Sequence, residues 1–460
     1  MNSEGSGLSG SILALLTLAL PLVYSVLVPY GAVVNVPAGL LLVGSFIFYV
    51  YTRSQTGRID RSHLLVFVAA LMLVFAYIIS SAYAHALNIG SLKTMLQVFL
   101  AVGFFLNAQE NAKLYSRSLS SFLPTLTLVL FTPIVAALIY YAWGLGNSGP
   151  GSIWTSIKNS LGAMLLALVL LNYLIRREKK LHGDSSALAT AALVASLTCL
   201  IASGSRGSIL ALFVTVLGFR LWFIRPKVIL LLGLFFFIGA FILIYINLGT
   251  LANLALMKGR VQSLTGQNLY SGRQLIWPAI IEAVRSHSIW LGLGADALAS
   301  TVMKMQGIYK SWSAHDLYLQ VYLQAGILGC AALATLFVAL WREIRAHAAD
   351  AWHERTACSF FLGVLAYEAF EVSLLQNNLS VGVVFWMTLG LMASRPRYLS
   401  TKLSTFSCSP TVSLAGAPPV ARIPEGHKRG FDAIFRRTAR SGAEETAAAD
   451  EPNGGRTRSS

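Results

Sequence analysis

Two arginines and one histidine are the residues whose types suit one common chemistry. Arg206 lies in a turn rich in serine and glycine at 203–208, and Arg273 lies in a polar stretch at 270–277. A guanidinium group stays charged and can donate two parallel hydrogen bonds, which suits phosphate oxygens. His315 directly precedes an apolar run, and a neutral imidazole can accept a proton near neutral pH. Such residues could stabilise a departing phosphate and deprotonate an attacking hydroxyl.

The turn around Arg206 is predicted to join two membrane helices. Its glycines and serines allow a sharp turn. The following helix would then begin there, with N–H groups and a helix dipole that favour an anion. Arg206 is therefore a candidate ligand of phosphate oxygens. The alternative is an arginine that only extends to the lipid interface.

The stretch around Arg273 carries a helix-start pattern. Ser271 and Gln274 have the spacing of a capping box, which predicts a helix with Arg273 in its first turn. Pro278 is expected to kink that helix. Arg273 is a second candidate for binding phosphate oxygens or, alternatively, an anchor for phospholipid. Tyr270 is a possible supporting residue.

His315 is the candidate catalytic base. Ser313 and Asp316 again have capping-box spacing, which predicts that His315 lies in the first turn of the next helix. The amino end of a helix favours the neutral ring, whereas the neighbouring Asp316 favours the charged ring. A single histidine at this depth could also be structural, and Asp316 is a possible supporting residue.

Two carboxylates, Glu368 and Glu371, are predicted to share one face of a membrane helix because they are three residues apart. Carboxylates at that depth usually pair with arginine or face a polar cavity. We expect them to neutralise Arg206 or Arg273, the alternative being a place beside the active site.

A metal or other cofactor is not expected at this outer face. The predicted outer carboxylates include no Asp-x-Asp pair and no cluster of histidine with aspartate, and a divalent metal needs ligands grouped closely. Arginine, not magnesium, should therefore meet the phosphate charge. Three other histidines are interpreted as structural: His63, His85 and His287.

The composition requires a membrane scaffold for these residues. Of 460 residues, 55% are hydrophobic and 12% are charged, against roughly 25% charged in soluble domains. Windows of about 20 residues predict an all-α integral membrane protein with twelve spans, near 10–28, 33–51, 63–84, 92–107, 120–143, 159–175, 186–202, 208–224, 228–249, 316–340, 357–376 and 378–394.

Basic residues set the predicted orientation. Of the 35 Lys and Arg residues, nine fall on the side that carries the long loop, and the other 26 fall on the opposite side. The positive-inside rule makes the richer side cytoplasmic and places both termini there. The net charge of +16 is then explained by topology and anionic lipids, and no nucleic-acid partner is expected.

The predicted organisation has four parts. Residues 1–249 hold spans 1–9, and 250–315 form one large outer loop with short interfacial helices. Residues 316–394 hold spans 10–12, and 395–460 form a basic, largely disordered cytoplasmic tail. Residues 431–437 of the tail could lie on the inner leaflet as a short amphipathic turn or belong to a solvated linker.

Together these segments resemble the O-antigen ligase and polymerase family of bacterial envelope glycosyltransferases. The resemblance covers predicted spans 7–10 with the long loop. It rests on Ser205-Arg206-Gly207, Ser271-Gly272-Arg273 with Trp277, Gly292-Leu293-Gly294, and His315 with Tyr318-Leu319-Gln320, Gly326 and Gly329. Two positions depart from the family pattern: Asp316 stands where asparagine is usual, and Gln324 where glutamate is frequent. Any proton relay through these two side chains is therefore left open.

The resemblance implies a GT-C-like enzyme in the inner membrane of a Gram-negative bacterium. It would transfer a glycan from undecaprenyl diphosphate to an acceptor at the periplasmic face, without a cofactor. Arg206 and Arg273 would bind the diphosphate, and His315 would deprotonate the acceptor. One displacement with one base predicts inversion at the anomeric carbon.

Within the family, twelve spans and a single dominant loop resemble ligases, which join O-antigen to the lipid A–core oligosaccharide. An O-antigen polymerase or a protein O-oligosaccharyltransferase is the alternative. From another class, a flippase or transporter of lipid-linked glycan is also basic and polytopic. Such a transporter should show paired broken helices and repeated halves.

Overall fold

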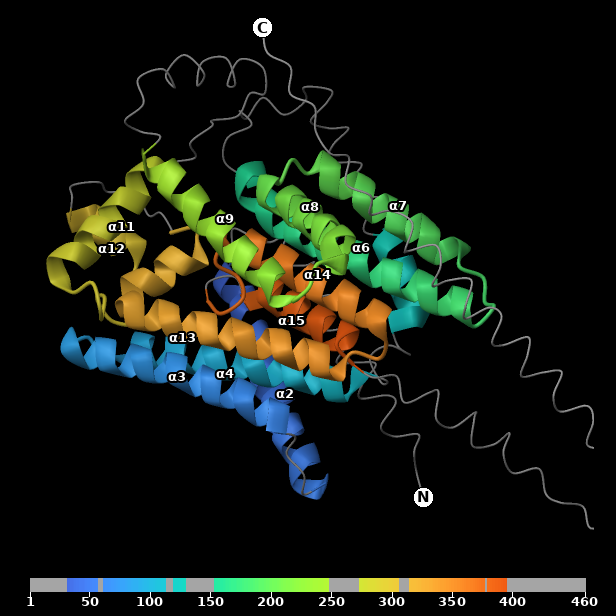
Figure 1. Cartoon of the computed structure of the whole chain (residues 1–460), viewed down its shortest axis with the longest axis horizontal. Coiled ribbons are helices and arrows are strands. Elements are labelled where there is room, and N and C mark those ends of the chain that lie inside the picture. The colour runs from blue at the N-terminus through green and yellow to red at the C-terminus, as the bar shows by residue number, and fades with distance from the viewer. Residues whose placement is uncertain are drawn as a thin grey trace, which may run out of the picture. The chain divides into compact units, whose positions relative to one another are not determined.

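The computed structural model describes residues 31–56, 61–112, 119–129, 153–247, 273–305, 314–376 and 379–394. Within these ranges all regular structure is helical (Figure 1), which confirms the all-α prediction. The helices are α2 (Gly31–Thr56), α3 (Arg61–Tyr83), α4 (Ile89–Glu110), α6 (Ile153–Leu181), α7 (Ala187–Ala202), α8 (Arg206–Arg220), η2 (Leu221–Phe223), α9 (Val228–Asn247), α11 (Arg273–His287), α12 (Ala299–Met305), α13 (Leu317–His347), α14 (Ala351–Glu368) and α15 (Leu379–Met392).

The protein is a multi-pass membrane protein. By length and hydropathy, five of the described helical segments can cross a bilayer: Arg61–Tyr83, Ile89–Glu110, Asn159–Leu181, Arg206–Phe223 and Leu317–His347. Five shorter apolar helices accompany them: Gly39–Ser54, Leu119–Val129, Ala187–Ala202, Val228–Ile244 and Val381–Met392. The total of twelve spans stays a prediction, because the first predicted span and the tail 395–460 lie outside the described residues.

The connection between α13 and α14 is shorter than the sequence predicts. The predicted spans 316–340 and 357–376 leave a connection over 341–356, but α13 continues to His347 and α14 begins at Ala351. Asp350 caps α14, since its carboxylate accepts hydrogen bonds from the N–H groups of Trp352 and His353, each at 2.8 Å. An effective N-cap of this kind starts a helix early, which hydropathy alone does not register.

The predicted span 357–376 is also corrected. Its helix, α14, ends at Glu368. The Glu368 carboxylate accepts hydrogen bonds from the backbone N–H groups of Ser373 at 3.0 Å and Leu374 at 3.3 Å. These bonds turn the chain back and leave Glu371 in a non-helical segment. Glu368 and Glu371 therefore do not share a helix face.

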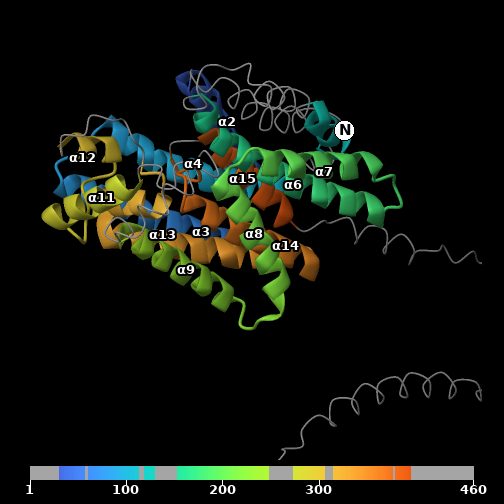
Figure 2. The same cartoon turned by 90° about the horizontal axis from the view of Figure 1, so that it is seen from above.

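Helix α14 occupies the interior of the bundle. Almost all of its residues from Thr356 onward are buried. It packs along α8 and also contacts α9, α13 and α15, while α13 packs along α3 and α6 along α7 (Figures 1 and 2). Helices α11 and α12 of the long loop lie together beside the start of α13 in both views. The loop is thus packed against the start of the helix that follows His315.

Helix α13 is interrupted at Gly326. Its φ of 59° and ψ of −152° lie outside the helical region, and φ values above zero are strained for any residue with a Cβ. A Cβ at Gly326 would lie only 2.5 Å from the carbonyl carbon of Trp290. Glycine is therefore required at this break, where the loop backbone approaches the helix.

The loop segment 289–294 supplies the hydrogen bonds that the break removes. The N–H groups of Leu293 and Gly294 donate to the carbonyls of Leu323 at 2.9 Å and Gln324 at 3.0 Å. On the other side of the break, the N–H groups of Ile327 and Leu328 donate to loop carbonyls at 3.0 and 3.1 Å. Buried backbone groups in a membrane protein need such partners, so the loop and the broken helix form one hydrogen-bonded unit.

Candidate active site

Arg273 is the first residue of α11, in agreement with the predicted helix start. Its guanidinium Nη2 donates a 2.6 Å hydrogen bond to the carbonyl of Phe370 and lies over the Phe370 ring. The same Nη2 is 4.0 Å from Oε1 of Glu371. The side chain is 14% exposed, so Arg273 is held in a fixed direction by the segment after α14. Tyr270, Ser271 and Gly272 lie outside the described residues.

His315 does not lie in the first turn of α13, which corrects the prediction. Asp316 is the N-cap, and its Oδ1 accepts a hydrogen bond from the N–H of Leu319 at 2.8 Å. His315 precedes that cap with a positive φ of 49°. For a residue with a side chain this conformation costs of the order of 1–3 kcal/mol, and such strain gathers at functional sites. The imidazole is 38% exposed, and its Nδ1 is 3.2 Å from Oε2 of Glu371.

Glu371 joins these residues. One carboxylate oxygen faces His315, while the other accepts a 2.5 Å hydrogen bond from Nδ2 of Asn159 on α6 and faces Arg273. Burial by itself raises the pKa of Glu371, but the hydrogen bond with His315, the charges of His315 and Arg273, and the Asn159 amide together lower it below the usual value. Glu371 is therefore an anion at neutral pH.

Arg206 begins α8, and its side chain is exposed. The N-cap Ser205 makes no side-chain cap hydrogen bond; its hydroxyl instead pairs with Ser208 Oγ at 2.9 Å. A Cβ at Gly207 would contact Phe370 Cβ at 3.2 Å. The start of α8 therefore packs against the residue whose carbonyl binds Arg273.

Two further hydrogen bonds fix the position of His315. The indole Nε1 of Trp277 on α11 donates to the carbonyl of Ala314 at 3.0 Å. The hydroxyl of Tyr318 on α13 donates to the carbonyl of Leu365 on α14 at 2.8 Å. The residue before His315 is thus bonded to the helix of Arg273, and the first turn after it is bonded to the helix that leads to Glu371.

Asp316, the N-cap of α13, is also buried. In the part of the chain that the structure describes, its Oδ2 has no hydrogen-bond partner. Burial therefore raises its pKa to about 7, against the lowering effects of the Leu319 N–H and the Arg273 charge. Glu368 is likewise buried, and its bonds to Ser373 and Leu374 give it a role in chain reversal.

Sequence reasoning did not find three parts of this arrangement. Asn159 stands at the start of a predicted span without any motif around it, and it meets Glu371 across 212 positions. The carbonyl of Phe370 offers no signal at all in a sequence. Trp277 was noted only as part of a resemblance, although an indole N–H in an apolar helix usually requires an acceptor.

The arrangement has the parts of an acid–base and anion-binding site. A carboxylate on Nδ1 holds one tautomer of the His315 ring, in which Nε2 carries the lone pair. The Arg273 guanidinium supplies positive charge beside Glu371, and the amino end of α8, which packs against Phe370, adds the positive end of a helix dipole. Such a site could deprotonate a hydroxyl while stabilising an anion.

One family model matches part of the chain that holds these residues. Residues 191–334 match the family model described as O-antigen ligase, a segment that contains Arg206, Arg273 and His315 and ends before Glu371. No curated protein matches the chain. Through residues 191–334, the chain is therefore similar to the domain that this family model describes.

Proposed function

We propose that this protein transfers a glycan from undecaprenyl diphosphate to an acceptor hydroxyl at the periplasmic face of the inner membrane of a Gram-negative bacterium. The family match indicates glycosyl transfer with lipid-linked glycans as substrates. The observation that carries the proposal is the contact of Glu371 with both His315 and Arg273. It brings a proton acceptor and a phosphate-binding cation from distant parts of the chain to one carboxylate.

Arg273 and Arg206 bind the diphosphate in this proposal. Breaking the bond between the sugar and the diphosphate leaves negative charge on a phosphate oxygen, and fixed cations at that oxygen lower the barrier. Arg273 is pre-organised by its hydrogen bond to the Phe370 carbonyl. Arg206 adds a second guanidinium at the amino end of α8, where the helix dipole favours an anion.

His315 acts as the base on the acceptor. Its Nδ1–H donates to Glu371, so the lone pair on Nε2 takes the proton of the attacking hydroxyl. The acceptor oxygen then bonds to the anomeric carbon as the bond to the diphosphate breaks on the opposite face, which inverts the configuration. Glu371 stabilises the imidazolium that forms, much as the carboxylate does in a catalytic triad.

The acceptor we propose is lipid A–core, which makes the protein an O-antigen ligase. The basis is the single long loop, here packed with α11 and α12 against α13. A second donor glycan would be the acceptor of a polymerase, and a protein hydroxyl that of a protein transferase. The break in α13 is a feature that a transporter would also carry. Its backbone groups, however, are satisfied by the loop segment 289–294, which favours a fixed joint over a substrate path.

Reconstitution tests this function. The full chain in proteoliposomes is given undecaprenyl diphosphate glycan with lipid A–core, a second donor glycan or a peptide, and the product is identified by gel mobility and mass. We expect lipid A–core to be glycosylated, with His315→Gln lowering the rate by about 10²- to 10⁴-fold. Equal turnover by His315→Gln would exclude a required base, and donor movement across the bilayer without any product would favour a transporter.

Transfer is also expected to proceed without a divalent metal at the outer face. Right-side-out vesicles treated with EDTA, which does not cross the bilayer, should keep their transfer rate. A rate that falls and is restored by added magnesium or manganese would refute this part of the proposal.

A further inference from the structure

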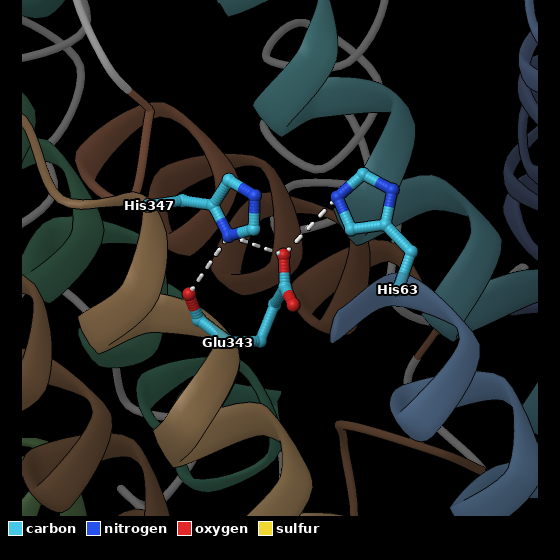
Figure 3. A group of neighbouring side chains, drawn as sticks. All are labelled: His63, Glu343 and His347. Carbon is cyan, nitrogen blue, oxygen red and sulfur yellow. Dashed lines mark hydrogen bonds and ion pairs between the residues drawn. The ribbon is translucent and has the colours of Figure 1, made fainter. Parts of the chain in front are cut away.

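A second group of ionisable side chains lies at the end of α13 opposite to His315. His63 comes from the first turn of α3, and Glu343 and His347 are one turn apart near the end of α13 (Figure 3). Glu343 Oε1 is 3.1 Å from His63 Nε2 and 2.8 Å from His347 Nδ1. Both rings thus direct a nitrogen at the same carboxylate oxygen.

The carboxylate of Glu343 is fully buried, as is His63. Despite the short distances, neither Glu343 oxygen nor His63 Nε2 has a partner with hydrogen-bond geometry among the described residues. Buried polar atoms without such partners are rare, and an ion that occupies the site is one of the few explanations. Burial of an anion also requires a balancing positive charge close by.

The donor set is that of a transition-metal site. The ligand atoms of the three residues all lie within 4.8 Å of one another. A tetrahedral ion with bonds of about 2.0–2.2 Å requires ligand atoms about 3–3.5 Å apart. Two imidazoles and one carboxylate suit zinc and its neighbours, whereas calcium and magnesium prefer oxygen ligands alone.

The surroundings of His63 fit this use. Its other ring nitrogen, Nδ1, is 3.2 Å from the hydroxyl of Tyr49, which can accept a hydrogen bond from Nδ1–H and so present Nε2 to a metal. Arg53 Nη2 lies 3.1 Å from the same Nδ1 and pairs with Glu110. Because a guanidinium can only donate, Nδ1–H can use Tyr49 alone as its acceptor. Glu110 Oε1 is 3.6 Å from His63 Nε2, which places a second carboxylate at the edge of the group.

The charges call for a cation at this group. With neutral rings and no added cation, Arg53 and Glu110 cancel and Glu343 leaves one buried negative charge. Protonation of one ring would balance that charge, and His347 Nδ1 also lies 3.3 Å from the carbonyl of Glu343. The ring centroids are 5.3 Å apart and the rings are tilted by 33°. A divalent ion between them would bind both nitrogens and the carboxylate at once.

We propose that His63, Glu343 and His347 bind one divalent first-row transition-metal ion of the zinc class, which joins the end of α13 to the start of α3. The site is structural and separate from the residues around Glu371, and its test does not depend on the transferase activity. It would fix the end of the same helix whose start carries His315.

Metal analysis of the full chain tests the site. The protein is purified in detergent with an affinity tag that contains no histidine, dialysed against metal-free buffer, loaded with Zn²⁺ and passed through a desalting column. We expect about one zinc per chain by mass spectrometry of the metal. The variants His63→Gln and Glu343→Gln should lose it, while His182→Gln should retain it. His182 is a matched control because it also faces a glutamate one turn away, Glu178, but at the surface.

Substitution with Co²⁺ gives a readout that needs no variant. Visible ligand-field bands of the intensity typical of four-coordination are expected in the wild-type chain. Their absence, together with less than about a tenth of a zinc per chain, would overturn the proposal and leave a group balanced by protons. Zinc that persists in a folded His63→Gln, His347→Gln double variant would overturn it as well.

Discussion

Nδ1 of His315 lies 3.2 Å from Oε2 of Glu371, across 56 residues of sequence. His315 stands before the N-cap of α13 in a strained conformation, and Glu371 stands after α14 in a segment without regular structure. Neither position is set by a helix, so each depends on the other and on the hydrogen bonds around them. The orientation of the candidate base is therefore a property of this pair.

Glu371→Gln should lower kcat by about 10²- to 10⁴-fold with little change in KM for the acceptor, because the amide cannot stabilise an imidazolium or fix its tautomer. The lowered pKa of Glu371 means that its ionised form is present above its unfolded value of 4.5 and is lost only in more acidic solution. Glu371 is therefore ionised at both about pH 6 and pH 8, and a deficit is expected at each.

Steady-state kinetics at these two pH values check the prediction. Glu282→Gln is the matched control, since Glu282 is exposed on α11 in the same loop and should leave kcat unchanged. A Glu371→Gln variant with normal kcat would remove the carboxylate from the mechanism.

Arg273→Ala and Arg206→Ala should each lower kcat by about 10²- to 10³-fold, the usual effect of removing one donor to a developing anion. Arg273→Lys should recover only part of the loss, because lysine cannot provide the planar fork. Arg285→Ala serves as the control, being exposed on the same helix as Arg273. Transfer assays, with membrane insertion measured in parallel, test this prediction. Near-normal transfer in both alanine variants would contradict the proposal that these arginines bind the diphosphate.

Asp316→Asn should change the pH dependence of stability. The folded pKa of about 7 lies above the unfolded 3.8, so the wild type loses stability as pH rises between these values and levels off above them. The loss amounts to about 4 kcal/mol over the whole window. Asparagine keeps the N-cap and has no group that titrates. The free energy of unfolding of the variant should therefore rise relative to that of the wild type between pH 4 and 7. Thermal unfolding in detergent measures this, and parallel curves would contradict it.

Gly326→Ala should destabilise the protein by roughly 3 kcal/mol or more, from a strained φ together with a close contact to the loop backbone. Gly239→Ala is the control, because a Cβ at that position in α9 has nothing within 4 Å. That variant should be neutral or stabilised by up to about 1 kcal/mol. The midpoint of thermal unfolding, compared between the two, gives the result; equal midpoints would show that the break tolerates a side chain.

Much of the scaffold can be predicted from hydropathy. The expected spans 63–84 and 228–249 correspond to α3 and α9 within two residues, because long apolar runs in a bilayer have little alternative to a helix. Hydropathy does not predict the helix ends that are set by hydrogen bonds from single side chains. The Glu368 carboxylate accepts hydrogen bonds from two backbone N–H groups just after α14. The Asp316 carboxylate caps α13 three residues later than the cap at Ser313 that the sequence predicts.

The candidate site is less accessible to sequence reasoning. Arg206, Arg273 and His315 can be selected by residue type and local motif. The role of Glu371 as the common neighbour of Arg273 and His315 cannot, because it depends on contacts with Asn159 and His315 made across 212 and 56 positions. One sequence holds no record of which distant carboxylate faces which ring.

The interrupted helix α13 restricts how substrates can enter. Four backbone hydrogen bonds join residues 289–294 to the break around Gly326. An outward movement of residues 289–294 would break these four hydrogen bonds. The N–H and C=O groups of both segments would then lack partners, which is costly in the apolar part of a membrane protein. Exchange of donor and acceptor should therefore proceed past a stationary loop, by lateral diffusion from the lipid, instead of through a gate that opens and shuts with each turnover.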